Sequence, residues 1–316
     1  MLQRRLGRTG LMVSELCLGT AGFGAQPFAD TSDPVLDAFV ECGGTFIDSA
    51  DIYGPEVGAS EAALGDWMRR RGNRQALVVA TKGGSPTGPH PTDRGLSRRH
   101  LLAAVEASLR RLGSDWIDLY QTHWPDPDTP DEETLSALDQ VVRQGKVRYV
   151  GCSNVPAWRL AHAQGISAAS HLVSYASVQP HYSLLARSSF ERELADAAVA
   201  LGVAVLPYRP LARGILAGRF HGGAIPEARW RSGPHGYDLD RGRAAALVAE
   251  IGKIASRDRR TVAQTALAWL FSKPGVTAPV VGASTPGQVA ELAGAVGYRL
   301  SAEHLEHLDE ASEWKS

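Results

Sequence analysis

The 316-residue chain has the composition of an ordinary globular protein, with 44% hydrophobic and 21% charged residues. Its 33 Lys and Arg residues nearly balance 34 Asp and Glu residues, and no basic run carries interleaved aromatic residues, which argues against a nucleic-acid partner. No stretch approaches the roughly 20 uninterrupted apolar residues that span a bilayer, and the basic N-terminus lacks the apolar core of a signal peptide. We therefore expect a cytoplasmic protein that does not work in a membrane.

The three cysteines are Cys17, Cys42 and Cys152. They are odd in number, far apart and without a C-x-x-C pair, so they predict neither a disulfide framework nor a zinc site. No metal is expected, and the compartment is expected to be reducing.

The elements follow a repeating order along the chain. A small hairpin is expected over residues 5–13, with its turn at 7–10, and then a short apolar run, a loop and an amphipathic helix recur. The predicted strands are residues 15–18, 45–48, 77–81, 117–121, 149–152, 173–178, 204–207 and 278–281. The predicted helices are residues 34–42, 60–71, 98–112, 131–144, 156–163, 189–201, 261–272 and 285–295, with further helices at 241–256 and 301–312.

Capping residues support several of these helices. Ser97 precedes a run with apolar residues at helical spacing, and Gly113 follows it. Thr261 starts another such run. Glycines at 43–44, 145, 165 and 202 fall where helices are expected to end.

Eight strand-helix units in about 300 residues predict a single (β/α)8 barrel over residues 1–316, with an N-terminal β-hairpin and two extra helices. The Gly/Arg-rich loop 209–240 is long enough to cover a bound cofactor or substrate. A doubly wound dinucleotide fold is the alternative, and it would need G-x-G-x-x-G after the first strand. The nearest match, Gly22-Phe-Gly24-Ala-Gln-Pro27, has proline at the third glycine and no immediate helix.

Titratable residues follow the predicted strands, at the barrel end that carries active sites. Asp48 ends the second strand, Tyr53 lies in its loop, Lys82 ends the third strand and His123 follows the fourth. Each alone is an ordinary polar residue, but four converging on one barrel mouth suit proton transfer to oxygen. An ammonium beside a phenol favours the phenolate, so Lys82 is expected to lower the pKa of Tyr53 by roughly one to three units.

These four residues suggest a separate chemical role for each. Asp48 would hold Lys82 charged, and His123 would orient a carbonyl oxygen that Tyr53 protonates. The arrangement needs neither a metal nor a covalent nucleophile. It would suit carbonyl reduction if a hydride source lay alongside.

Because of these residues and the motifs around them, the chain resembles the aldo-keto reductase family, in particular its bacterial-type NAD(P)H-dependent members. The resemblance rests on Phe-Ile-Asp-Ser-Ala-Asp-Ile-Tyr-Gly, Thr-Lys-Gly and Tyr-Gln-Thr-His-Trp-Pro-Asp, which carry the family's tetrad as Asp48, Tyr53, Lys82 and His123. It extends nearly end to end, through Gly-Lys-Val-Arg-Tyr-Val-Gly-Cys-Ser-Asn and Val-Gln-Pro-His-Tyr-Ser-Leu-Leu. It implies NAD(P)H-dependent reduction of an aldehyde or ketone, reversibly, with Tyr53 as general acid.

The resemblance also implies a cofactor site across the barrel mouth. Its expected contacts are Gly19, Thr20, Asp48, Ser153, Asn154, Gln179, Tyr208, Arg209, Leu211, Gly214, Leu216, Gly282, Ser284, Thr285, Gln288 and Glu291. The expected substrate pocket is formed by Phe23, Tyr53, His123, Trp124 and parts of the loop 209–240.

The chain departs from the family at two places that affect the expected cofactor preference. The family's usual Tyr-Ser-Pro-Leu is Tyr208-Arg209-Pro210-Leu211 here. The family's NADP-preferring members usually carry a Lys or Arg after the eighth strand, whereas residues 282–288 contain none and the next basic residue is Arg299. NADP(H) is the favoured cofactor and NAD(H) the alternative.

A second class of function stays open. Some members of this family are cofactor-binding subunits of membrane channels, with incidental catalysis. The fold is expected to begin within the first few residues, without an added N-terminal segment, which favours the enzyme. The sequence predicts neither the carbonyl substrate nor the oligomeric state.

Overall fold

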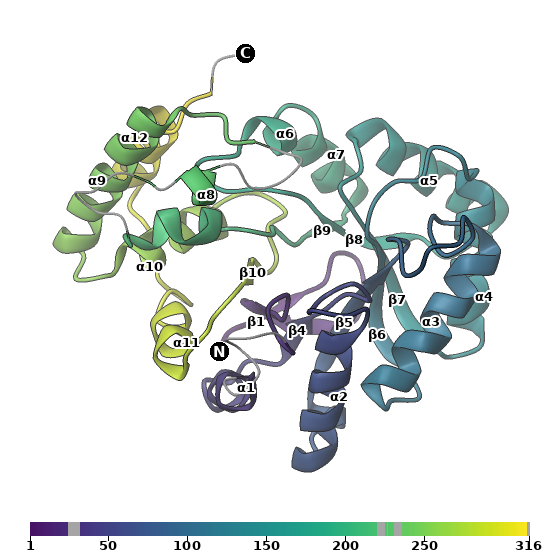
Figure 1. The fold of residues 1–316 in the computed structure, drawn as a ribbon. Coiled ribbons are helices and arrows are strands. Elements are labelled where there is room, and N and C mark those ends of the chain that lie inside the picture. The colour runs from purple at the N-terminus through teal and green to yellow at the C-terminus, as the bar shows by residue number, and fades with distance from the viewer. Residues whose placement is uncertain (25–31, 220–224, 226, 231–235, 315–316) are drawn as a thin grey trace.

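The computed structural model describes residues 1–24, 32–219, 225, 227–230 and 236–314. Eight strands form one parallel sheet in the order β10-β3-β4-β5-β6-β7-β8-β9, and the helices lie around the outside of the strands (Figure 1). The strands are β3 (Cys17–Gly19), β4 (Phe46–Asp48), β5 (Val78–Gly83), β6 (Ile117–Thr122), β7 (Val147–Ser153), β8 (Tyr175–Gln179), β9 (Ala204–Val205) and β10 (Val280–Val281).

Backbone contacts between β9 and β10 close this sheet into a barrel. Isolated parallel bridges join Val205 to Val276 and Tyr208 to Val280. The Val280 amide donates to the Pro207 carbonyl at 2.8 Å, and the Thr277 amide donates to the Val205 carbonyl at 2.8 Å. The expected (β/α)8 barrel is therefore confirmed, and closure leaves its sheet without a free edge.

The expected hairpin fills one end of the barrel. It consists of β1 (Gln3–Arg5) and β2 (Met12–Ser14), which pair antiparallel. Leu6 and Val13 are fully buried against apolar side chains that include Cys17 and Phe46, the first residues of β3 and β4. Since the hairpin covers the end at which the strands begin, the opposite end is left for a site.

The helices agree with the predicted order, and the expected caps are present. Ser97 accepts a hydrogen bond from the His100 amide, and Thr261 forms a capping box with Gln264. The helices are α1 (Ser32–Glu41), α2 (Ala59–Arg71), α3 (Arg98–Leu112), α4 (Asp131–Arg143), α5 (Ala157–Ser170), α6 (Ser188–Glu191), α7 (Leu194–Leu201), α8 (Glu227–Trp230), α9 (Arg241–Arg257), α10 (Val262–Phe271), α11 (Pro286–Ala293) and α12 (Ala302–Ala311), with 3-10 turns η1 (Arg74–Ala76) and η2 (Ala212–Ala217).

Two helix predictions were wrong. The helix predicted at 156–163 continues through Gly165 to Ser170, where His171 in the left-handed conformation ends it. Leu160 and Ser167 bury one face of this helix on both sides of the glycine, and that packing outweighs the cost of about 1 kcal/mol for a helical glycine. The helix predicted at 189–201 is two helices, α6 and α7, separated by residues 192–193.

The long loop predicted at 209–240 contains η2 and α8. Residues 220–224, 226 and 231–235 of it lie outside the described residues, as does that part of the expected substrate pocket. Among the helices described, none is long and apolar enough to cross a membrane.

Candidate active site

The ends of the parallel strands bring the predicted polar residues to one rim of the barrel. Asp48 is the last residue of β4, Lys82 lies near the end of β5, and His123 follows β6 directly. Ser153 and Gln179 are the last residues of β7 and β8 and are paired in register. Residues from five strands therefore meet at the barrel end opposite the hairpin.

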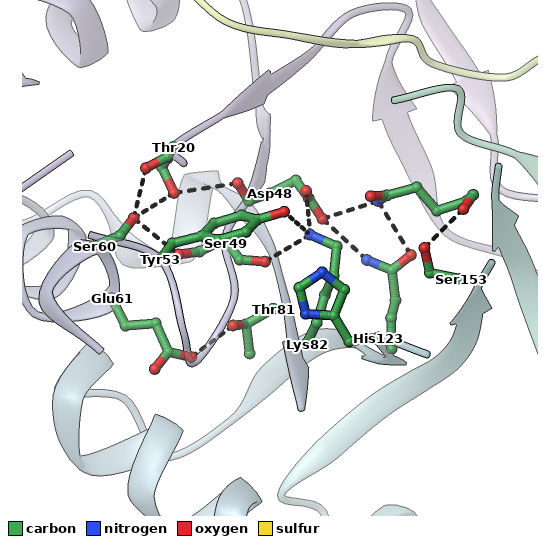
Figure 2. Close-up of polar contacts among 12 residues, drawn as sticks. Thr20, Asp48, Ser49, Tyr53, Ser60, Glu61, Thr81, Lys82, His123 and Ser153 are labelled. Carbon is green, nitrogen blue, oxygen red and sulfur yellow. Dashed lines mark hydrogen bonds and ion pairs between the residues drawn. The ribbon is translucent and has the colours of Figure 1, made fainter. Parts of the chain in front are cut away.

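The ammonium group of Lys82 is fully buried and makes three hydrogen bonds (Figure 2). Its Nζ donates to Asp48 Oδ2 at 2.5 Å, to the Ser49 carbonyl at 2.8 Å and to the Tyr53 hydroxyl at 3.3 Å. An ammonium has three protons, so all three are used. The Tyr53 oxygen acts as an acceptor from Lys82, and its own proton is therefore available for an acceptor in the open space beside it.

The second oxygen of Asp48 also accepts hydrogen bonds. Gln121 Nε2 and Gln179 Nε2 donate to Asp48 Oδ1 at 3.0 Å and 3.2 Å. Gln121 was not among the predicted site residues, although its position at the end of a predicted strand was a usable signal. The two amides and Lys82 fix the carboxylate of Asp48 in one orientation.

Hydroxyl groups hold the segment that carries Tyr53. Ser60 Oγ donates to the Thr20 carbonyl at 2.8 Å, and its amide donates to the Tyr53 carbonyl at 3.0 Å. Thr20 Oγ1 donates to the Asp48 carbonyl at 3.2 Å. Thr20, predicted to contact the cofactor, is fully buried in this network and supports Asp48 and Tyr53 from behind.

Lys82 lowers the pKa of Tyr53, as expected, but this effect does not decide the net shift. Burial raises the pKa of Tyr53 above its usual value of 10.0, outweighing the positive charge of Lys82, and the charge of Asp48 raises it further. Asp48 lies within hydrogen-bond distance of the ammonium and neutralises much of its field at the phenol. Tyr53 is therefore protonated at neutral pH, the form that a proton donor requires.

Lys82 and His123 also have defined charge states. Burial opposes the charge of Lys82, yet the carboxylate of Asp48 and the neighbouring Tyr53 raise its pKa above the usual value, so the side chain is an ammonium. Burial and the charge of Lys82 lower the pKa of His123 to about 3. His123 is a neutral imidazole, and its ring meets that of Tyr53 edge-on at 5.8 Å between centroids.

A cleft of about 780 Å³ opens above these residues. Its lining includes Tyr53, His123 and most of the residues predicted for the cofactor and substrate, namely Gly19, Phe23, Asp48, Trp124, Ser153, Asn154, Gln179, Tyr208, Arg209, Leu211, Gly214, Gly282, Ser284, Gln288 and Glu291. Thr20, Lys82, Leu216 and Thr285 are not part of the lining. The volume falls within the roughly 300–1,000 Å³ typical of ligand pockets.

Tyr208 and Asn154 form one side of the cleft. The Tyr208 hydroxyl donates to Asn154 Oδ1 at 2.9 Å, and burial raises the pKa of Tyr208 to about 12, so this donor keeps its proton. Asn154 Nδ2 donates to the His123 carbonyl and to Ser153 Oγ, each at 3.0 Å. His181 stacks on Tyr208 at 5.3 Å between ring centroids. The aromatic face of Tyr208 is thus held at a fixed angle.

The far end of the cleft is formed by the start of α11 and by the segment around η2. Thr285 caps α11, accepting from the Gln288 amide, and Gln288 Oε1 accepts from the Ser284 amide at 2.9 Å. Arg213 and Arg219 also line the cleft, although neither was a predicted site residue. Both lie in the loop 209–240, which was expected to cover a cofactor or substrate, and this was the signal in the sequence.

A buried carboxyl group lies directly behind the site. Asp51 is fully buried, and neither carboxylate oxygen has a hydrogen-bond partner among the described residues. Burial and the negative charge of Glu61 raise its pKa from 3.8 to about 7, against the opposing charges of Arg111 and Lys82. The folded protein therefore binds a proton at Asp51 that the unfolded chain releases at lower pH.

Replacing Asp51 with Asn should stabilise the protein at alkaline pH. Because the folded pKa is raised, Asp51 lowers the free energy of unfolding progressively between about pH 4 and pH 7, by up to about 4 kcal/mol. Urea unfolding at a series of pH values should show that Asp51→Asn removes this decline. The exposed Asp115→Asn is the matched control, and an unchanged pH profile in Asp51→Asn would contradict the assignment.

The fold and these contacts define a (β/α)8 barrel with an acid-base site at the carboxyl ends of its strands. A sequence model described as "Aldo/keto reductase family" matches residues 15–313. The chain belongs to the aldo/keto reductase family, as the sequence motifs indicated, and it is thus a member of an oxidoreductase family.

Two relatives illustrate the range of proteins that this chain is similar to. An "Uncharacterized oxidoreductase YrpG" of Bacillus subtilis (strain 168) is 36% identical over 314 residues, covering 96% of this chain and 94% of the relative. A "Probable voltage-gated potassium channel subunit beta" of Arabidopsis thaliana is 32% identical over 296 residues, covering 92% of this chain and 90% of the relative.

Proposed function

We propose that this protein is a cytoplasmic NAD(P)H-dependent reductase of aldehydes or ketones. The observation that carries the proposal is the Tyr53 hydroxyl, which accepts the third proton of the Lys82 ammonium and faces a cleft beside the neutral His123. A protonated phenol held in this way can give its proton to an oxygen in the cleft. Proton donation to oxygen is half of carbonyl reduction.

Each tetrad residue has its own role in the reduction. His123 binds and orients the carbonyl oxygen, and Tyr53 transfers its proton to that oxygen as negative charge develops there. The charge of Lys82 stabilises the phenolate that remains, and Asp48 keeps the ammonium in place. In the reverse direction, the phenolate takes the proton from an alcohol. When bound, the reduced nicotinamide cofactor supplies the hydride.

The cleft lining fits such a cofactor. Tyr208 offers an aromatic face for the nicotinamide ring, and polar groups of Ser153, Asn154 and Gln179 surround it. Leu211 and Gly214 would lie along the pyrophosphate, and Gly282, Ser284, Gln288 and Glu291 would surround the adenosine. Phe23 and Trp124 would contact the substrate.

We expect NADPH to bind more tightly than NADH. Arg209, Arg213 and Arg219 line the cleft and replace the basic residue that the segment 282–288 lacks. Because each guanidinium can bind phosphate oxygens, Arg213→Ala combined with Arg219→Ala should reduce the NADPH affinity at least tenfold and the NADH affinity less.

Titration of protein fluorescence with NADPH and NADH measures both affinities. Arg5→Ala, an exposed arginine at the opposite end of the barrel, is the control for loss of a positive charge. Equal losses for the two cofactors would show that these arginines bind only the phosphates that both cofactors share.

The function itself is tested by turnover. The purified protein should oxidise NADPH when given members of a panel of aldehydes and ketones, and absorbance of the reduced cofactor measures the rate. If the protein binds neither NADPH nor NADH, the proposed function is wrong.

The relative named as a potassium channel subunit favours a second candidate function, that of a cofactor-binding subunit of a membrane channel. Co-purification of the tagged protein with a membrane partner, combined with slow turnover on every carbonyl tested, would favour this candidate. Rapid turnover without a partner would favour the enzyme.

A further inference from the structure

Ser85 contacts the histidine of the tetrad from behind. Its Oγ lies 3.2 Å from His123 Nδ1, and the two side chains are only 3% and 8% exposed. Neither the motifs of the sequence nor the tetrad includes this serine. Because Ser85 contacts Nδ1, the other ring nitrogen of His123, Nε2, faces the cleft.

The backbone fixes this pair. The His123 amide donates to the Gly83 carbonyl at 2.9 Å, which joins the end of β6 to the end of β5. Gly84 then turns the chain with φ of 103°, a conformation that favours glycine, and Ser85 follows. Strand β5 therefore supplies Lys82 to the site, and the turn directly after it supplies Ser85.

The direction of this hydrogen bond follows from the burial of both groups. A neutral imidazole carries one N–H, on either Nδ1 or Nε2. If Nδ1 carried it and donated to Ser85, the buried hydroxyl proton would have no acceptor, since no other partner of Ser85 Oγ is found among the described residues. If Ser85 donates to Nδ1, both groups are satisfied, and Nε2 carries the proton at the cleft.

We infer that Ser85 is a positioning residue that holds His123 in the tautomer protonated on Nε2, so that His123 donates a hydrogen bond to the substrate oxygen. This inference rests on the proposed function for its consequence in turnover, whereas the tautomer itself is a property of the protein alone. A His123 protonated on Nδ1 would present a lone pair to the carbonyl oxygen and repel it.

The test reads the tautomer directly. Protein labelled with ¹⁵N at histidine is examined by long-range ¹H–¹⁵N correlation at neutral pH, and comparison with His123→Gln identifies the His123 signals among those of the 10 histidines. The expected signature is a protonated Nε2 and an unprotonated, hydrogen-bonded Nδ1. A protonated Nδ1 in the native protein overturns the inference.

Variants of Ser85 then connect the tautomer to turnover. Ser85→Ala should lose the hydrogen-bonded Nδ1 signature and lower kcat about threefold to tenfold with unchanged NADPH affinity, and Ser85→Thr should restore both. Unchanged His123 signals and kcat in Ser85→Ala overturn the inference. If Ser85→Ala does not fold, the spectra of the native protein and of Ser85→Thr still show which ring nitrogen of His123 carries the proton. If the native protein shows the expected signature but reduces no carbonyl, the proposed function fails and the tautomer assignment stands.

Discussion

Replacement of Tyr53 by Phe should lower kcat by about 100-fold to 10,000-fold and leave cofactor binding intact. The change removes the hydroxyl that is placed to give a proton to an oxygen in the cleft, while the ring and its edge-on contact with His123 remain. Lys82 keeps its bonds to Asp48 and the Ser49 carbonyl, so the fold should be preserved. Steady-state turnover and fluorescence titration with NADPH measure the two effects separately.

The matched control for this variant is Tyr208→Phe, which removes a phenol from the same cleft that is not placed to reach the carbonyl oxygen. We expect Tyr208→Phe to weaken cofactor binding through loss of its bond to Asn154, with a smaller effect on kcat. Near-normal turnover by Tyr53→Phe would exclude Tyr53 as the general acid. Loss of both turnover and cofactor binding would indicate instead that the hydroxyl is needed for the structure of the cleft.

Replacement of Lys82 by Met should abolish measurable turnover and destabilise the protein by about 3–5 kcal/mol. Lys82 and Asp48 are a buried ion pair, with side chains 0% and 2% exposed. Removing the ammonium leaves the carboxylate of Asp48 buried, with the amides of Gln121 and Gln179 as its side-chain donors among the described residues. An unpaired buried charge is costly because the protein interior solvates it poorly.

The double variant Lys82→Met/Asp48→Asn separates stability from chemistry. Neutralising Asp48 removes the unpaired charge, so urea unfolding should show that at least half of the lost stability returns. Turnover should stay absent, because no ammonium remains to stabilise the phenolate of Tyr53. Recovery of turnover in the double variant would contradict the role assigned to Lys82.

Local signals in the sequence were sufficient for much of the architecture. The helix at 98–112 agrees with α3 at both ends, because Ser97 and Gly113 are local capping residues whose effect needs no tertiary contact. The alternation of short apolar runs with amphipathic helices predicted the barrel, and closure between β9 and β10 agrees with it. The C-terminal end of α5 depended on packing on both sides of Gly165, and the sequence pattern missed it, as it missed the division of α6 from α7.

The sequence by itself therefore determined the family, the order of the strands and which residues follow each strand end. In a parallel barrel that information places Asp48, Lys82 and His123 on one rim, because all the strands run in the same direction. Their chemical roles stay predictions until the variants are measured.

Only the tertiary structure decided the electrostatics. The pKa of Tyr53 depends on the competition between burial, the charge of Lys82 and the neutralising charge of Asp48, and the sequence does not show how enclosed the phenol is. The sequence likewise does not show that Asp51 is buried without a hydrogen-bond partner among the described residues, or that Ser85 contacts His123. Burial and the distance between charges belong to the folded chain, because folding brings together residues that are far apart in the sequence and removes water from between them.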